Sequence, residues 1–230
     1  MRVMNYLILS IAGAVLIAAA SLLGSSNINN IQIFDKLIVG GAFIASCVFG
    51  ISFAVRPNWL KRLTKRESRY VNEKQAYAAV RKRQGHHPDC VHFKSHTIII
   101  KNKIFCAGCM GLAIGSIISI FFMIAYIVLN NEIAPNIILI FIFMGMILVG
   151  VNYIETAIPV RNTTVHIILN IFLVIGFFFV VAGIFQLTGS IIYGMFGIII
   201  SFLWLDARIQ LSHVRHANIC KNCSESCKVY

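Results

Sequence analysis

The sequence predicts an all-α membrane protein: a polytopic bundle of about six transmembrane helices with a cytoplasmic cap rich in Cys and His. Of the 230 residues, 58% are hydrophobic and only 12% are charged, whereas about 25% of an average soluble domain is charged. The hydrophobic residues also gather in uninterrupted blocks, and a block of about 20 is what a helix needs to cross the hydrocarbon core. An ordinary soluble enzyme is therefore excluded.

Each block is expected to be a helix, because lipid offers backbone amides no hydrogen-bond partner. The six predicted crossings are Tyr6–Leu23, Leu37–Val55, Ile104–Leu129, Ile137–Ile154, Val165–Phe185 and Ile191–Leu205. The chain then divides into two helices in 1–55, a basic loop in 56–103, four helices in 104–205 and a Cys/His-rich tail in 206–230. The sequence leaves open whether the first block is cleaved as a signal peptide, which would not change the rest of the topology.

The basic residues predict the orientation. Thirteen of the 20 Lys and Arg lie between Arg56 and Lys103, and six more fall on the same side of the membrane. Only Lys36 falls on the other side. Cytoplasmic loops carry such an excess of Lys and Arg. We therefore expect a multi-pass protein of the plasma or inner membrane with both termini in the cytoplasm.

The basic loop is expected to begin as a helix at Pro57 and to end that helix before Gly85. Its cations either rest on anionic lipid headgroups or form a solvated stalk, and the sequence leaves both open. No aromatic platform or groove-reading motif accompanies the charge, so nucleic acid is not an expected partner. The lipid bilayer is the expected partner, and any protein partner is unidentified.

Six of the seven Cys and six of the seven His fall into two polar clusters. The first cluster comprises His86, His87, Cys90, His92, His96, Cys106 and Cys109. The second comprises His213, His216, Cys220, Cys223 and Cys227. Four predicted crossings separate the clusters, and because this number is even, both clusters face the same side and can meet. In a reducing cytosol, such a pattern predicts metal ligation rather than disulfides.

The spacing within each cluster suits a tetrahedral ion. In the Cys-x-x-Cys of residues 106–109, both sulfurs can turn toward one zinc at about 2.3 Å, and Gly108 allows the tight turn. The pair in residues 220–223 repeats this spacing. Six thiolates and six imidazoles exceed the eight ligands that two sites need. Zinc is the first expectation because it suits mixed thiolate and imidazole ligation.

An iron–sulfur cluster is the alternative cofactor, since the three tail cysteines with Cys90 would supply four thiolates. A redox interpretation also competes. Cys106 and Cys109 stand where the third block begins, and the partial positive charge of a helix N-terminus favours reactive thiolates. Membrane thiol oxidoreductases that pass electrons to quinone use such a pair.

The stretch from His87 to Gly115 resembles the signature of a family of prokaryotic multi-spanning membrane proteins of unknown function. That signature combines Cys-His, Arg-Ser and Cys-Ala-Arg-Cys-x-Gly at the head of a helix. The matching residues are Cys90, Ser95, Cys106, Ala107, Cys109, Gly111 and Gly115. The chain departs from the signature at Lys94 and Gly108, where the family has Arg. The resemblance implies that the first cluster forms a unit, and it implies no activity.

Ionisable residues near the ends of the later blocks are expected at the membrane interface, where headgroup contacts make them inexpensive. They are Glu155, Arg161, His166 and Asp206. The functional alternative is a polar vestibule beneath the metal sites, in which carboxylates orient the imidazoles.

Three function classes remain. The first is a non-enzymatic scaffold or sensor with a cap held by structural zinc, and the second is a thiol or iron–sulfur redox protein. The third is a membrane-embedded metal-dependent enzyme. No hydrolase, kinase or protease motif supports the third class, so an enzyme is the less favoured expectation and no catalytic residue is assigned.

Overall fold

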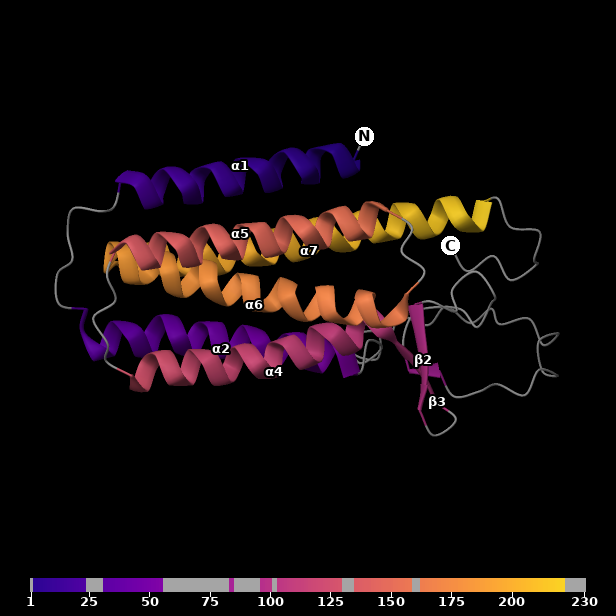
Figure 1. Ribbon diagram of the computed structural model, residues 1–230, viewed down its shortest axis with the longest axis horizontal. Helices are drawn as coiled ribbons and strands as arrows, with labels where there is room; N and C mark the ends of the chain where they lie inside the picture. The colour runs from indigo at the N-terminus through magenta and orange to yellow at the C-terminus, as the bar shows by residue number, and fades with distance from the viewer. Residues whose placement is uncertain are drawn as a thin grey trace, which may run out of the picture.

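Six helices that are long and apolar enough to cross a membrane make up the computed structural model, among the residues that it describes. Those residues are 2–23, 31–55, 83–84, 96–100, 103–129, 135–158 and 162–221. The helices are α1 (Arg2–Leu23), α2 (Ile33–Val55), α4 (Ala107–Val128), α5 (Pro135–Ala157), α6 (Thr163–Thr188) and α7 (Ile191–Lys221). They lie side by side in one bundle (Figure 1), so the predicted multi-pass helical membrane architecture is confirmed.

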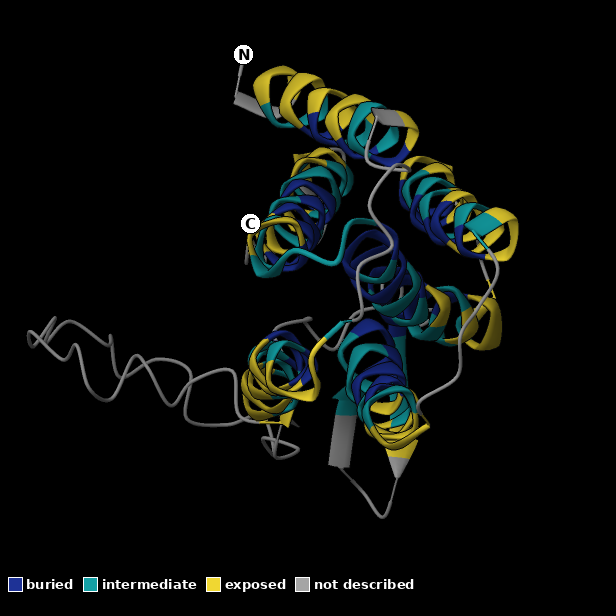
Figure 2. Ribbon diagram, turned by 90° about the vertical axis from the view of Figure 1, so that its left-hand side faces the viewer, coloured by how far each residue is buried: buried dark blue, intermediate teal, exposed yellow. Residues whose placement is uncertain are grey.

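Helix α6 lies at the centre of the bundle and packs against α4, α5 and α7. Its residues are apolar around the whole circumference, and such a helix is stable when it is surrounded by protein. Half of its 26 residues are buried, among them Leu173, Val180 and Phe185. In Figure 2 the buried positions face the middle of the bundle and the exposed ones face outward. Large apolar side chains such as Phe121 and Ile192 cover that outer surface, as lipid contact requires.

Glycines let α5 and α6 approach closely. A Cβ atom added to Gly145 would stand 2.7 Å from the carbonyl oxygen of Gly176, and one added to Gly176 would stand 2.8 Å from that of Gly145. Small residues at helix contacts are the usual means of close packing in membranes. Gly150 on the same helix differs, since a Cβ there would meet nothing within 4 Å.

Polar side chains join the helices inside the apolar region. The indole nitrogen of Trp204 on α7 donates to the carbonyl oxygen of Ser10 on α1 (3.0 Å), and the hydroxyl of Tyr153 on α5 donates to the carbonyl oxygen of Trp204 (2.7 Å). The hydroxyl of Tyr126 on α4 donates to Gln186 on α6 (2.6 Å). These bonds satisfy groups that lipid cannot satisfy.

A small sheet stands at one end of the bundle, beside the start of α4 (Figure 1). Strands β2 (Thr97–Ile100) and β3 (Lys103–Cys106) pair antiparallel, with Thr97 opposite Cys106, and β1 (Arg83–Gln84) pairs parallel to β3. Helix α1 begins and α7 ends at this same end (Figure 1). We call it the polar end.

Two predicted boundaries differ from the ends of the helices. The third crossing was expected from Ile104, but residues 104–106 belong to β3 and the helix begins at Ala107, because the β-branched run in 97–100 gives this segment a strand partner. The sixth helix extends well past the predicted end of the crossing at Leu205, since α7 continues to Lys221. Beyond Leu205 one face of α7 still packs on the bundle, and Arg215 donates to the carbonyl oxygens of Thr156 (2.9 Å) and Ile158 (3.0 Å).

Of the basic loop in 56–103, the structure describes β1, His96, β2 and Lys103. The helix expected between Pro57 and Gly85 cannot extend to its predicted end, because Arg83 and Gln84 pair with β3 instead. Residues 56–82 lie outside the described residues, so the rest of that expected helix and its lipid contacts stay predictions.

We predict that Gly145→Ala destabilises the bundle by about 1–3 kcal/mol, the usual cost of overpacking a filled core. The added methyl group would meet a backbone oxygen, which cannot rotate away. The measurement is the thermal unfolding midpoint of the protein in detergent. Gly150→Ala on the same helix is the control, and it should leave the midpoint unchanged or raise it slightly. Equal midpoints for both variants would contradict the close approach of α5 and α6.

Candidate functional site

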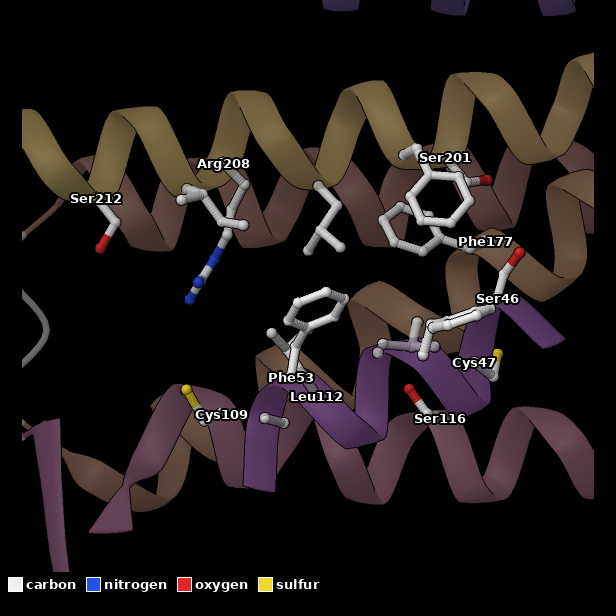
Figure 3. A pocket seen from close by; sticks show the side chains of 18 of the residues that line it. Ser46, Cys47, Phe53, Cys109, Leu112, Ser116, Phe177, Ser201, Arg208 and Ser212 are labelled. Atoms are coloured by element: carbon white, nitrogen blue, oxygen red, sulfur yellow. The ribbon is translucent and has the colours of Figure 1, made fainter. Parts of the chain in front are cut away.

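A cavity of about 460 Å³ lies at the polar end, between α2, α4, α6 and α7. Its wall is mostly apolar and includes Phe43, Phe53 and Phe177. At one end the wall becomes polar, and this part is made by Cys106, Cys109, His166, Arg208, Ser212, His213 and His216. Figure 3 shows Arg208 extending from α7 toward the side where Cys109 stands on α4.

The hairpin and the start of α4 bring the two thiols of the first cluster together. Cys106 is the last residue of β3 and stands directly before the helix, and Cys109 falls in the first helical turn. The side chains of these two cysteines are hydrogen-bonded to each other. Cys106 is buried, as are Ala107 and Gly108 between the pair. The prediction that both sulfurs of the Cys-x-x-Cys turn toward one metal ion stays a prediction.

Three histidines from three parts of the chain meet beside the thiols. His96, directly before β2, places its ring 4.9 Å from the ring of His166 on α6 and 5.4 Å from the ring of His216 on α7, measured between centroids. His96 and His216 are buried. The loop that carries the first cluster therefore touches the helix that carries the second. An even number of crossings between the two clusters makes this contact possible, because it places both on the same side.

Glu155 holds His166 in place. The Nδ1 atom of His166 lies 2.8 Å from Oε1 of Glu155, and both residues are buried. The other ring nitrogen, Nε2, faces the Cys-x-x-Cys turn, since it lies 3.1 Å from the position that a Cβ atom of Gly108 would occupy. A carboxylate on one imidazole nitrogen leaves the second nitrogen oriented for a ligand.

These contacts correct one expectation from the sequence. Glu155 and His166 were expected at the exposed membrane interface, but only 5% and 7% of their surfaces are accessible. Burial is tolerated because each supplies the other with a partner. Asp206 is half-buried and accepts a hydrogen bond from Gln210 (3.5 Å), and Arg161 lies outside the described residues. Of the vestibule expected from Glu155, His166 and Asp206, the structure pairs the first two, and its role beneath a metal site stays a prediction.

Arg208 is a buried cation that the sequence analysis did not single out. Its surface is 7% accessible, and its Nε atom has no hydrogen-bond partner in the described part of the chain. Within that part, no ion pair is recorded between Arg208 and a carboxylate, and Glu155 pairs with His166 instead. The sequence did hold a signal for its burial, because Ser201, Trp204 and Arg208 are spaced to share one face of a helix. The predicted end of the crossing at Leu205 left Arg208 outside that helix face.

Of the predicted metal ligands, the structure describes the side chains of His96, Cys106, Cys109, His213 and His216. These five lie at the polar end, and the last four line the cavity. Cys220 is placed in α7 by its backbone. The other candidates lie outside the described residues, and they are His86, His87, Cys90, His92, Cys223 and Cys227.

Among the described residues, no group of three or more His, Cys, Asp or Glu side chains is arranged to hold a metal ion. The hydrogen-bonded thiols of Cys106 and Cys109 are two of the four ligands that a tetrahedral site needs. Zinc and the iron–sulfur alternative therefore stay predictions.

No family model, curated protein or solved structure matches the chain. The resemblance of residues 87–115 to a family signature therefore stays an interpretation of that stretch alone. A function for this protein has to be argued from the chemistry of the polar end.

We predict that Glu155→Ala destabilises the protein by about 3–5 kcal/mol, because it leaves His166 buried without its partner. Glu155→Gln should cost less, since the amide oxygen can still accept from Nδ1. Denaturant-induced unfolding in mixed micelles measures both. The control is Asp206→Asn, which alters a half-buried carboxylate and should change stability by less than about 0.5 kcal/mol. Unaltered stability of Glu155→Ala would show that the pair does not hold the vestibule together.

Proposed function

We propose that this membrane protein binds a structural zinc ion at its polar end, with the thiolates of Cys106 and Cys109 as two of the ligands. The observation that carries the proposal is the convergence of these thiols at the junction of β3 and α4. The ion would fasten the loop before α4 to the end of α7. On this proposal the protein is a scaffold or sensor rather than an enzyme, and its protein partner is unidentified.

The imidazoles beside the thiols support the proposal. A structural zinc site needs four ligands in a closed shell. His166 presents Nε2 toward the Cys-x-x-Cys turn while Glu155 engages Nδ1, the arrangement that zinc-bound histidines commonly show. The ring of His96 contacts the ring of His166, and it also contacts the ring of His216. These imidazoles are the described candidates for the remaining two ligands.

The excess of Lys and Arg supports a cytoplasmic polar end. Nineteen of the 20 basic residues belong to segments on this side of the membrane, and such segments stay in the cytoplasm. The reducing cytosol keeps cysteines as thiols and favours their use as metal ligands. The termini would then both be cytoplasmic, in the plasma or inner membrane.

Metal analysis of the detergent-purified protein tests the proposal. We expect about one zinc ion or more per chain, and loss of zinc from Cys106→Ala and from Cys109→Ala, because each removes a thiolate ligand. Cys47→Ala is the matched control: Cys47 is a buried cysteine within α2, and its loss should leave the zinc content unchanged. Zinc well below one per chain in the unaltered protein, without iron–sulfur absorbance, would overturn the proposal.

A redox function is the second candidate, and the hydrogen-bonded thiols of Cys106 and Cys109 beside an apolar cavity favour it. The pair would lose two protons and two electrons and form one S–S bond. A membrane quinone entering from the lipid would accept both protons and both electrons and leave as the hydroquinone.

Alkylation of thiols in isolated membranes separates the two candidates. A zinc-bound pair should become reactive when a chelator is added, without a reductant, because the metal is what protects the sulfurs. An oxidised pair should become reactive only when a reductant is added. Mass analysis of the peptide that contains Cys106 and Cys109 reads the result, and reactivity of Cys47 under denaturing conditions serves as the internal control.

A further inference from the structure

The guanidinium of Arg208 is a buried positive charge in need of an anion. Its Nη2 atom lies 3.5 Å from the position that a Cβ atom of Gly108 would occupy, so it reaches across the cavity from α7 to the start of α4. Glu155, Cys106, Cys109 and Tyr153 interact with it electrostatically, but among the described residues none of them is recorded as an ion-pair partner of Arg208, and Oε1 of Glu155 is bonded to His166. Because its Nε atom has no hydrogen-bond partner among the described residues and a buried charge is costly unless it is paired, a bound anion would stabilise this end.

The rest of the cavity suits a hydrocarbon chain. It continues from Arg208 along α7 toward Ser201 and Ile198, and Phe177 on α6 and Phe43 on α2 line this stretch. Figure 3 shows Phe177 beside Ser201, at the far side of the view from Arg208. Its volume of about 460 Å³ falls within the range of about 300–1,000 Å³ of small-molecule sites, and is much smaller than a two-chain phospholipid.

The cavity borders the surface that faces lipid. Four of its apolar lining residues are exposed on the described part of the bundle, namely Phe49 and Phe53 on α2 and Phe202 and Ile209 on α7. Since Phe49 and Phe202 lie well within spanning helices, lipid surrounds them, and Ile209 lies closer to the interface. A ligand can therefore enter sideways from the membrane between α2 and α7.

The depth of Arg208 matches the headgroup region. It lies 17 residues after Ile191, where α7 begins, and at about 1.5 Å per residue this is roughly 26 Å along the helix. The hydrocarbon core is about 30 Å thick. The cation therefore stands near one interface, and the apolar part of the cavity extends from it toward the middle of the membrane, in the orientation of a lipid in that leaflet.

We propose that the cavity binds an amphiphile with one hydrocarbon chain and an anionic headgroup, taken from the membrane. The headgroup oxygens, carboxylate or phosphate, would accept two parallel hydrogen bonds from Arg208, and the chain would pack along Phe177 and Phe43. The proposal stands apart from the zinc site, because it rests on Arg208 and on the apolar wall.

Binding of a fluorescent long-chain fatty acid to the full-length protein in nanodiscs of zwitterionic lipid tests the proposal. We expect saturable binding, and at least ten-fold weaker binding of the fatty alcohol of equal chain length, because the alcohol offers Arg208 no charge. This comparison on the unaltered protein stands even if a variant fails to fold. Equal affinity for acid and alcohol would overturn the assignment of Arg208 to the headgroup.

Variants then locate the charge. Arg208→Gln should weaken fatty-acid binding at least ten-fold and remove the preference over the alcohol, whereas Arg208→Lys should keep most of the preference. Lys221→Gln, an exposed cation at the end of the same helix, is the matched control and should bind like the unaltered protein. An equal loss of affinity in Lys221→Gln would show only general electrostatic attraction and would overturn the proposal.

Competition separates a membrane amphiphile from a free anion. Inorganic phosphate and acetate at millimolar concentration should leave fatty-acid binding unchanged, because they lack the chain that fills the cavity. Displacement by either at the affinity of the fatty acid would show that the site serves a free anion, and the proposed amphiphile would be wrong. Absence of saturable fatty-acid binding in the unaltered protein would have the same consequence.

Discussion

A bilayer offers a buried polar group no partner, so each polar group inside the bundle needs one from another helix. The pair of Glu155 on α5 and His166 on α6 is where this constraint has the largest effect. It fixes the imidazole that contacts His96 before β2. His96 in turn contacts His216 on α7. The arrangement of the whole polar end therefore depends on one carboxylate and one imidazole that satisfy each other.

The apolar part of the bundle supports this arrangement by bringing helices close to α6. Gly145 and Gly176 bring the backbones of α5 and α6 together, and Gly111 does the same for α4 and α6. Because α6 is central, its first turn delivers His166 to the same place as the first turn of α4 delivers Cys109. Close packing far from the site thus determines which side chains meet at the site.

The polar end combines two kinds of chemistry. Thiols and imidazoles are soft ligands that suit a metal such as zinc, while Arg208 and the apolar wall suit an anionic amphiphile. The two sites interact electrostatically, since thiolates at Cys106 and Cys109 would lie near the guanidinium of Arg208. A bound metal would reduce the negative charge of the thiolates and leave Arg208 more in need of an external anion.

The sequence by itself determined the helical membrane class, the six spans and the shared side of the two Cys/His clusters. These follow from block length, hydrophobicity and the even number of crossings, which are local or countable properties. Only the tertiary structure decided that Glu155 and His166 pair, that Arg208 is buried and that β3 precedes α4. Such features depend on which faces of distant helices pack together. Hydrophobicity along the chain does not predict this packing, because all faces of a lipid-embedded helix are apolar.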